Sequence, residues 1–371
     1  MSIPAFSDIS IVGGGPAGLA AAIAFSQKGF AATVVDCAIP PIDKACGEGL
    51  MPDSVAVLQQ LGVTLPAGIG YRFRGIRFCD ENSTVTANFP VGFGVGLRRT
   101  ALHQILIRRA EECNVNLNWG VKHVDLAGCG ISVDGELIAS KFVVGADGQN
   151  SRIRTQSGLH RVRGEQRRYG FRRHYRLAPW SDYVELYWGR TCQIYITPVA
   201  PDEVCVALIS RDPKLRLDAA LREFPMVREH LASASVVSSE MGVLSISRTL
   251  RRVVLPGLAL VGDASGSVDA VTGEGMCLAF RQALALATAL ETKNLPGYES
   301  AHRSIYWRPR AMAWLMLRLD AHRGFQRRAL AALAQRPGVF ASLLGIHVGE
   351  QSFADLLSWQ LVGFCRAFLS A

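Results

Sequence analysis

A chain of 371 residues with a formal net charge of +9 is too long for one small core and has the size of two closely joined domains. Hydrophobic residues make up 49% of it and charged residues 19%, which excludes a disordered protein. We see no secretory leader and no uncharged apolar run of about 18 residues, so we expect neither export nor a transmembrane helix. The nine cysteines are scattered without a C-x-x-C pair, so we expect no bound metal, no disulfide framework and a cytoplasmic location.

The positive charge is concentrated in two segments. Arg161–Arg176 contains seven arginines and one glutamate, and Ala301–Arg336 contains eight arginines and one aspartate. No nucleic-acid-binding motif accompanies this charge, so we do not expect nucleic acid as a partner. The remaining interpretations are a solvated basic face, or attraction for an anionic substrate, a nicotinamide phosphate, an acidic carrier protein or a membrane surface.

The N-terminal segment predicts a dinucleotide-binding turn. An apolar run, Ile9–Val12, leads into Gly13-x-Gly15-x-x-Gly18, an Ala/Leu-rich stretch and a second apolar run that ends at Asp36. This pattern is typical of a strand, a glycine-rich turn, a helix and a second strand. The glycines allow a tight turn, a close approach to a pyrophosphate and close helix–strand packing, and the final carboxylate can bind an adenosine ribose. The alternative is a purely structural glycine-rich turn.

Two later segments predict strands that end in acidic turns. Val143–Arg154 reads "VVGADGQNSRIR" and turns at Asp147, and Gly257–Ala264 reads "GLALVGDA" and turns at Asp263. Open α/β sheets bind ligands at the carboxyl ends of their strands, where a carboxylate can accept hydrogen bonds from a sugar alcohol. A Gly-Glu-Gly turn then opens the next predicted helix, whose N-terminus can stabilise negative charge on an adjacent ring.

In this order and spacing the three motifs resemble those of the flavoprotein monooxygenase superfamily with the p-hydroxybenzoate-hydroxylase-like fold, from Ile9 to Leu290. The resemblance implies that the first motif binds the ADP half of FAD, the Asp-Gly motif contacts the pyrophosphate region and the Gly-Asp motif binds the ribityl chain. The family also carries Arg-x-x-Leu-x-x-x-Leu on a helix beneath the flavin, which here begins at Arg99, with Arg98 as the competing choice. No His or Cys stands in an evident flavin-attachment motif, so we expect FAD to be bound non-covalently.

Within the superfamily the chain is most similar to the geranylgeranyl-reductase-like branch. Asp43–Pro52, "DKACGEGLMP", is similar to a Lys-x-Cys-Gly loop of that branch, and Thr272–Gly275 is similar to its Thr-Gly-Glu-Gly. The sequence departs from the pattern at Ala270, where the family has proline, and in Gln193–Val199, which lacks the Trp of the reductases. The FAD-binding residues that the resemblance implies are Gly13, Gly15, Pro16, Ala17, Gly18, Asp36, Lys44, Cys46, Gly47, Arg99, Asp147, Asp263, Gly273, Gly275 and Met276.

The electron donor is expected to be NAD(P)H, bound transiently. A second nucleotide fingerprint is absent, and we interpret Gly92-x-Gly94-x-Gly96 as a crossover loop. A separate flavin reductase is the alternative donor. The related flavin-dependent halogenases need a W-x-W-x-I-P segment, which does not occur here.

The predicted fold is α/β, with a Rossmann-type FAD-binding domain, an inserted, mainly antiparallel β-sheet substrate domain and a helical C-terminal tail. Alternating apolar and polar residues favour the antiparallel sheet, and helical spacing of apolar residues favours the tail. The FAD-binding domain comprises residues 1–72, 97–159 and 257–296, the substrate domain residues 73–96 and 160–256, and the helical region residues 297–371.

Few polar residues are candidates for the chemistry. Cys46, His174 and Tyr195 are the candidate catalytic residues. Alternatively, Cys46 is only a small loop residue, His174 is a surface residue among arginines, and Tyr195 serves only in packing. Tyr187, Tyr195 and Pro198 are expected to contact the substrate. Glu274 is expected to present its backbone rather than its carboxylate to the flavin.

These observations predict an FAD-dependent oxidoreductase. Our first hypothesis is a NAD(P)H-using monooxygenase that hydroxylates an aromatic or lipophilic secondary metabolite, free or attached to a carrier protein. The alternatives are a geranylgeranyl-reductase-like enzyme that saturates carbon–carbon double bonds, a flavin-dependent halogenase and a flavin-binding protein without turnover.

Overall fold

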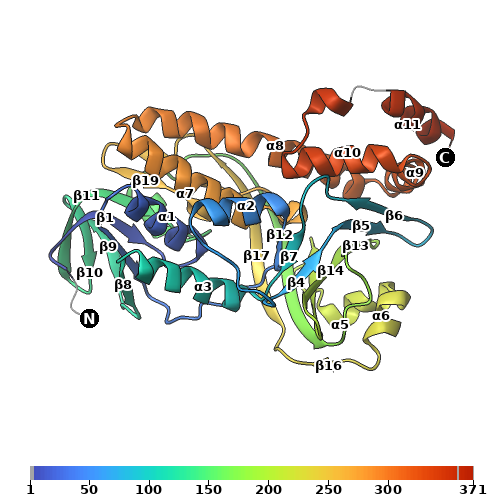
Figure 1. Ribbon diagram of the computed structural model, residues 1–371, viewed down its shortest axis with the longest axis horizontal. Coiled ribbons are helices and arrows are strands. Elements are labelled where there is room, and N and C mark those ends of the chain that lie inside the picture. The colour runs from blue at the N-terminus through green and yellow to red at the C-terminus, as the bar shows by residue number, and fades with distance from the viewer. Residues whose placement is uncertain (1–3, 357–358, 371) are drawn as a thin grey trace.

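The first domain is built on a mainly parallel sheet. The computed structural model describes residues 4–356 and 359–370 (Figure 1). The sheet has the order β18-β19-β11-β1-β2-β8, and β9 and β10 extend it from β11. Its central strands pair in parallel, as expected where helices cross over between strands. The bounds are β1 Phe6–Val12, β2 Ala32–Asp36, β8 Asn116–Trp119, β9 Val124–Ala127, β10 Gly130–Val133, β11 Glu136–Gly145, β18 Val254–Leu255 and β19 Leu258–Leu260.

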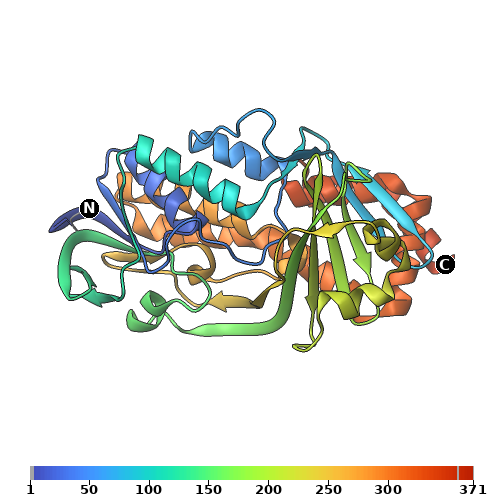
Figure 2. The same cartoon turned by 90° about the horizontal axis from the view of Figure 1, so that it is seen from below.

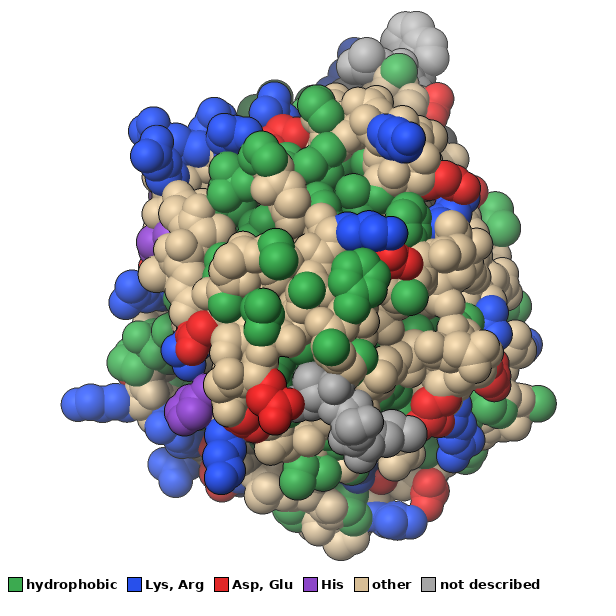
Figure 3. All heavy atoms as spheres, turned by 90° about the vertical axis from the view of Figure 1, so that its left-hand side faces the viewer, with side chains coloured by type: hydrophobic (Ala, Val, Ile, Leu, Met, Phe, Trp, Pro, Cys, Tyr) green, Lys and Arg blue, Asp and Glu red, His purple; other side chains and the backbone are tan. Residues whose placement is uncertain are grey.

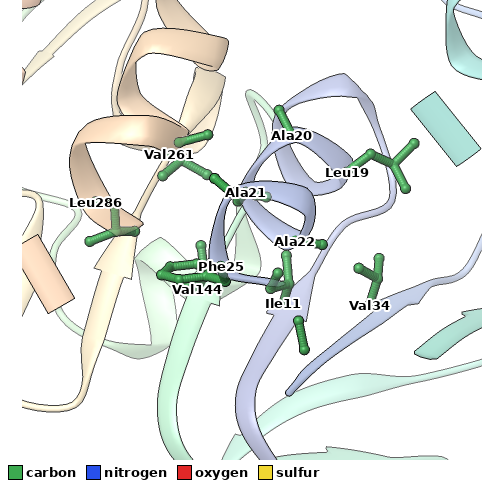
Figure 4. Packing of buried hydrophobic residues seen from close by; sticks show 14 of the residues in the cluster. Ile11, Leu19, Ala20, Ala21, Ala22, Phe25, Val34, Val144, Val261 and Leu286 are labelled. Carbon is green, nitrogen blue, oxygen red and sulfur yellow. The ribbon is translucent and has the colours of Figure 1, made fainter. Parts of the chain in front are cut away.

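Helix α1, Pro16–Gln27, lies at the centre of this domain. It packs between α3, Arg99–Glu112, and α7, Gly275–Glu291, and against β1. A helix that is covered on all sides is apolar on all sides, and the run from Leu19 to Phe25 is fully buried. Figure 4 shows this packing, with Phe25, Ile11 and Val144 in one cluster. The glycine-rich turn therefore joins two deeply buried elements and is held in place by both.

The second domain is an antiparallel sheet of eight strands. Its order is β16-β12-β15-β14-β13-β5-β6, with β17 paired to β12 and one parallel pair, β13 with β5. A smaller sheet, β3-β7-β4, joins the two domains. The bounds are β3 Gly49–Leu50, β4 Tyr71–Phe73, β5 Gly75–Cys79, β6 Thr84–Asn88, β7 Gly94–Gly96, β12 Val162–Arg176, β13 Val184–Trp188, β14 Cys192–Ala200, β15 Glu203–Ser210, β16 Ser235–Val236 and β17 Met241–Leu250.

Both faces of this sheet are covered. Short helices α5, Leu217–Ala220, and α6, Pro225–Leu231, pack on one face, and the C-terminal helices pack on the other (Figure 2). Every residue of β13 and of β15 is consequently buried, so apolar residues on both faces replace a polar alternation. The remaining helices are α2 Pro52–Gln60, which packs on α7, and α4 Arg152–Gln156, with 3-10 turns η1 Leu221–Glu223, η2 Gly262–Ser265, η3 Ala270–Thr272 and η4 Phe353–Leu356.

The C-terminal region is helical. Helix α8, Leu295–Ala321, starts against α7, and α9, Arg323–Gln335, and α10, Pro337–Val348, continue over β6. Helix α11, Trp359–Ser370, packs on α9. The tail thus contacts both domains, and the expected α/β class with an inserted antiparallel sheet and a helical tail is confirmed.

Among the described residues, no single helix is both long and apolar enough to span a membrane. The helices α9 and α10 meet these criteria only when taken as one segment, and the chain bends by 105° between them.

Truncation of Phe25 should destabilise the first domain. The side chain is fully buried, and removing a buried aromatic ring costs about 3–5 kcal/mol because apolar contacts are lost and a cavity remains. Denaturant unfolding of F25A followed by circular dichroism measures this loss. The control is F93A, at a phenylalanine that is 54% exposed, which should change stability by less than about 0.5 kcal/mol. Equal effects of the two substitutions would contradict the assigned core.

Candidate active site

A cavity of about 860 Å³ extends between the two domains to the C-terminal helices. One end is lined by the loops that follow the parallel strands, including Gly15, Gly148 and Asp263. The other end is lined by apolar side chains of the C-terminal helices, including Leu333 and Phe340. The cavity therefore joins a polar end, rich in glycine, to an apolar end.

Two helix N-termini open onto the polar end. Helix α1 begins after Gly15 and helix α7 after Glu274, and neither end carries a side-chain cap. Their first N–H groups lack intrahelical partners, and the helix dipole makes both ends positive. Such an end binds phosphate groups or a ring that carries negative charge.

The glycines at this end leave room for a ligand. A Cβ placed on Gly15, Gly47, Gly273 or Gly275 would have no neighbour within 4 Å, so these positions border open space. The first and third glycines of the N-terminal motif have a different role. A Cβ on Gly18 would collide with the carbonyl oxygen of Gly13, and Gly13 itself has a φ of +109°. The motif therefore combines a tight turn with an open cradle.

Charged side chains complete the polar end. Asp263, Lys44 and Arg99 line the cavity, and the Nε atom of Arg99 is buried without a hydrogen-bond partner among the described residues. The Asp263 side chain is open to the cavity, yet its deep position desolvates it and raises its pKa, which Arg99 and Lys44 oppose. An acceptor carboxylate, two cations and two free helix ends fit the ribityl chain and the pyrophosphate of FAD.

Of the other predicted FAD-binding residues, most line the same cavity. These are Pro16, Ala17, Cys46, Gly47, Gly273, Gly275 and Met276. Arg98, the competing choice to Arg99, forms an ion pair with Glu203.

The carboxylates of Asp36 and Asp147 bind backbone groups of the first domain, and their roles toward FAD stay predictions. The Asp36 carboxylate accepts hydrogen bonds from the backbone N–H groups of Gly14 and Ala38, at 2.6 and 2.7 Å, so it braces the turn after β1. The Asp147 carboxylate accepts hydrogen bonds from the Ser151 hydroxyl and from backbone N–H groups at the start of α4. The Asp147 carboxylate is therefore taken up by the start of α4, which Ser151 also caps, while Gly148 of the same motif lines the cavity.

The predicted substrate contacts divide by sheet face. Tyr195 lines the cavity, and its hydroxyl donates to the carbonyl of Val271 at 2.9 Å, while burial raises its pKa. Tyr187 is directed to the opposite face, where its hydroxyl donates to Glu185 at 2.7 Å. Tyr187 therefore lies outside the cavity, and Val184 and Leu186 of β13 line it instead, so contact of Tyr187 with substrate stays a prediction.

Pro198 also lies outside the cavity. Its carbonyl packs directly against Gly96 of the small joining sheet, so closely that a Cβ on Gly96 would collide with it. The contact of Pro198 with substrate therefore stays a prediction. Thr197, its neighbour on β14, lines the cavity in its place.

His174 is buried between the domains rather than exposed among arginines. Its Nε2 lies 2.6 Å from Glu48 Oε2, and its Nδ1 lies 2.8 Å from Ser238 Oγ and 3.2 Å from the guanidinium of Arg172. Because a guanidinium only donates, Nδ1 accepts, and Nε2 carries the proton that it donates to Glu48. His174 does not line the cavity, so the catalytic role considered for it has no support in this geometry.

Cys46 lies between that buried pair and the cavity. It lines the cavity, and its sulfur accepts a hydrogen bond from the backbone N–H of Glu48 at 3.4 Å. Burial raises the pKa of the thiol, so Cys46 stays protonated and unreactive at neutral pH.

Candidate metal ligands also occur in this region. Potential ligand atoms of Glu48, His174 and Cys205 lie within 4.8 Å of one another. The carboxylate and the imidazole already satisfy each other, and the Arg172 guanidinium lies 4.0 Å from the carboxylate, so this group needs no cation.

The arginine-rich strand β12 is mostly neutralised. Arg167 pairs with Glu165, Arg173 pairs with Asp218 and Glu240, and Arg176 pairs with Asp202. The buried Arg168 pairs with Asp269, and the buried Arg172 pairs with Asp43. On the face of the first domain in Figure 3, Lys and Arg side chains likewise lie near Asp and Glu side chains. A uniform basic face at β12 is therefore excluded.

Sequence reasoning missed one cavity residue of chemical interest. His347 of α10 lines the cavity beside Thr272, and its Nε2 lies 3.1 Å from the Thr272 carbonyl. No local motif surrounds His347 in the sequence, and only the docking of α10 brings it to this position.

Substitution of Asp263 by alanine should cost FAD affinity more than stability. The lost hydrogen bonds are charge-assisted and worth about 1.5–3 kcal/mol, which corresponds to roughly a 10- to 150-fold weaker Kd. Fluorescence titration of the apoprotein with FAD measures this change. The control is D212A, at an exposed aspartate outside the cavity. Wild-type affinity of D263A would show that this carboxylate does not hold the cofactor.

Comparison with known proteins agrees with this geometry. Residues 7–216, more than half of the chain, match the model of an FAD binding domain family. A menaquinone reductase from Mycobacterium tuberculosis is 28% identical over 327 residues, which cover 80% of this chain and 79% of that protein. A 3-demethoxyubiquinol 3-hydroxylase from Escherichia coli is 27% identical over 321 residues, 76% of this chain and 79% of that one.

Among solved structures, a flavoprotein/dehydrogenase from Cytophaga hutchinsonii superimposes with a TM-score of 0.80 at 17% identity. The match covers 92% of this chain and 93% of that one, and it shows a shared fold. With the family match, the glycine cradle and the two free helix ends, the chain belongs to the FAD binding domain family and is an FAD-dependent oxidoreductase.

Proposed function

We propose that the protein is a NAD(P)H-using monooxygenase that hydroxylates a lipophilic or aromatic secondary metabolite carrying an extended apolar portion. The observation that carries this proposal is the continuity of the cavity from the glycine cradle to the C-terminal helices. The reacting group would lie at the cradle, and the apolar portion would lie among the helices.

The apolar end is suited to a hydrocarbon chain. Its wall consists of aliphatic, thioether and aromatic side chains from four helices: Met312, Leu315, Met316, Leu319, Phe325, Ala329, Leu333, Val339, Phe340, Leu343, Leu344, Phe364, Phe368 and Leu369. Each methylene group that is transferred from water into such a wall contributes about 0.8 kcal/mol. Binding of a chain of several carbons would therefore be strong without a single polar contact.

The polar groups nearest the cradle are few. Tyr195 and Thr197 from β14 and His347 from α10 are available to orient a substrate. Bound FAD would supply the two-electron chemistry. The apolar walls exclude water from the reacting atoms, which a hydroxylation needs to avoid losing reducing equivalents.

The names of the relatives support a ring-bearing lipid. One is named for menaquinone and another for demethoxyubiquinol. In the hydroxylation proposed here, one oxygen atom of O₂ enters the substrate and the other leaves as water, with NAD(P)H as the reductant. Binding to a carrier protein, to a membrane surface or to a separate flavin reductase remains a prediction.

A second candidate function is reduction of a carbon–carbon double bond or of a quinone-like ring. The match to a menaquinone reductase over about four fifths of both chains favours this candidate. It differs from hydroxylation in needing no oxygen.

One experiment separates the two candidates. The FAD-loaded protein is incubated with NADPH or NADH and a panel of alkyl-substituted naphthoquinones and quinolones, with ¹⁸O₂ and without oxygen. A product that contains one ¹⁸O atom and forms only with oxygen supports hydroxylation. A product formed without oxygen, with two added hydrogen atoms, supports reduction. Absence of NAD(P)H oxidation with every compound would contradict both.

Filling the apolar end should select against long chains. Ala329 lines the cavity on α9, so A329F should weaken binding of a long-chain ligand at least about tenfold and leave a short-chain analogue little changed, because the new ring occupies the chain's volume. Changes in the FAD absorbance spectrum upon titration measure both affinities. A334F, at an exposed position of the same helix, is the control. Equal affinity of A329F for both chain lengths would place the apolar chain elsewhere.

A further inference from the structure

A buried cluster of charged and titratable side chains lies behind the loop Thr272–Gly275. It comprises Asp53 of α2, Glu274 at the N-cap of α7 and His347 of α10, with the Cys277 thiol beside them and the partly exposed Arg281 of α7 and Arg308 of α8 at its edge. Asp53 is satisfied: it lies 2.9 Å from Arg281, 3.6 Å from Arg308 and 3.2 Å from the Cys277 sulfur. By contrast, Glu274 and His347 each have one buried side-chain atom without a hydrogen-bond partner among the described residues.

The neighbours of His347 determine which of its ring nitrogens carries a hydrogen. Its Nε2 lies 3.1 Å from the carbonyl oxygen of Thr272, and a carbonyl only accepts, so Nε2 carries a hydrogen. Its Nδ1 faces Glu274 Oε2 at 3.5 Å. His347 Nδ1 and Glu274 Oε2 are both buried, and neither has a hydrogen-bond partner among the described residues.

This arrangement requires one shared proton. Without it, a nitrogen lone pair would face a carboxylate, and two buried acceptors would repel each other. With it, the pair is either imidazolium and carboxylate or imidazole and carboxylic acid, and both are attractive. Burial raises the pKa of Glu274, as does the charge of Asp53, while His347, Arg308 and Arg281 oppose this rise. The neighbouring carboxylate and the neighbouring cations therefore act on Glu274 in opposite directions.

The pair is directly joined to the flavin cradle. Glu274 is the N-cap residue of α7, and its two neighbours, Gly273 and Gly275, border the open space of the cavity. His347 is bonded to the backbone of the same loop and itself lines the cavity. A change of charge at the pair therefore acts on the uncapped helix end that faces the cofactor.

We propose that Glu274 and His347 form a redox-linked proton site. Reduction of FAD by a hydride from NAD(P)H brings two electrons but one proton, so negative charge is added at the cradle. This charge raises the affinity of the nearby pair for its shared proton, which enters from solvent. Oxidation of the flavin removes the charge and releases the proton. The pair thus positions charge at the α7 terminus according to the state of the cofactor.

The sign of the pH dependence follows from linkage. Between the pKa of the pair with oxidised FAD and its higher pKa with reduced FAD, reduction takes up one proton more. Within this window, raising the pH by one unit lowers the ratio of reduced to oxidised FAD at fixed potential by an additional factor of about ten. Outside the window this additional factor disappears.

The test measures flavin midpoint potentials by dye equilibration over about pH 5 to 9, where histidine and raised carboxyl groups titrate. The proteins are FAD-loaded wild type, E274Q and H347Q. Proton uptake upon reduction is followed in parallel with an indicator dye, after subtraction of the protons that dithionite itself releases when it is oxidised. The additional pH dependence should be present in the wild type and absent from both variants. R308Q should keep it but move the window to higher pH, because Arg308 lowers the pKa of Glu274.

The control is H302Q. His302 is another buried histidine of the C-terminal region, it is bonded to Ser265 at 2.9 Å, and it lies outside the cavity. Burial lowers its pKa to about 3, so its loss should leave the potential–pH curve unchanged. Curves of E274Q and H347Q that match the wild type would overturn the proposal. FAD content and circular dichroism identify a misfolded variant. If E274Q does not retain FAD, the potential–pH curve of H347Q decides the outcome. No substrate is used, so the outcome is independent of the proposed hydroxylation.

Discussion

Two helix N-termini that open onto one cavity without capping side chains are the constraint on which the rest of the structure depends. The free N–H groups of α1 and α7 need an anionic or electron-rich partner. To present them, the first domain buries α1 from Gly18 to Phe25 and holds the turn at Gly262 by a hydrogen bond from its backbone N–H to Gln282 of α7. The Tyr298 hydroxyl donates to the last residue of β19 and so ties α8 to the same strand end. The core is thus arranged to keep an otherwise unfavourable pair of helix ends in place.

The second domain is fixed to the first by hydrogen bonds and ion pairs of buried side chains. Arg172 pairs with Asp43, His174 with Glu48, and Arg168 with Asp269, and each pair joins β12 to a loop of the first domain. A buried charge is costly unless it is paired, so these contacts add little net stability but penalise any other placement of the sheet. They therefore define the width of the cavity at the cradle.

The features that the sequence predicted are local. The glycine-rich turn, the strand ends at Asp263 and the helix that starts at Arg99 each depend on a few adjacent residues, and the structure places all three at the cavity. Contacts between distant segments could not be predicted. Glu48 and His174 are 126 positions apart, and His347 meets Glu274 only because α10 folds back over the cavity. Tyr187 lies on the face of β13 that is turned away from the cavity, and period-2 alternation in the sequence does not tell which face of a strand buried on both sides meets a cavity.

The same division separates the glycine cradle from the apolar wall of the cavity. Residues that form the cradle come from strand ends and helix starts, whose positions are set by backbone hydrogen bonding. The apolar wall comes from side chains of α8 to α11, which can change in size without altering that backbone. His347 is the exception, since a side chain of α10 there contacts the loop of the cradle. Through this contact the position of the Thr272–Gly275 loop depends on how the C-terminal helices are docked, so the two ends of the cavity are structurally coupled.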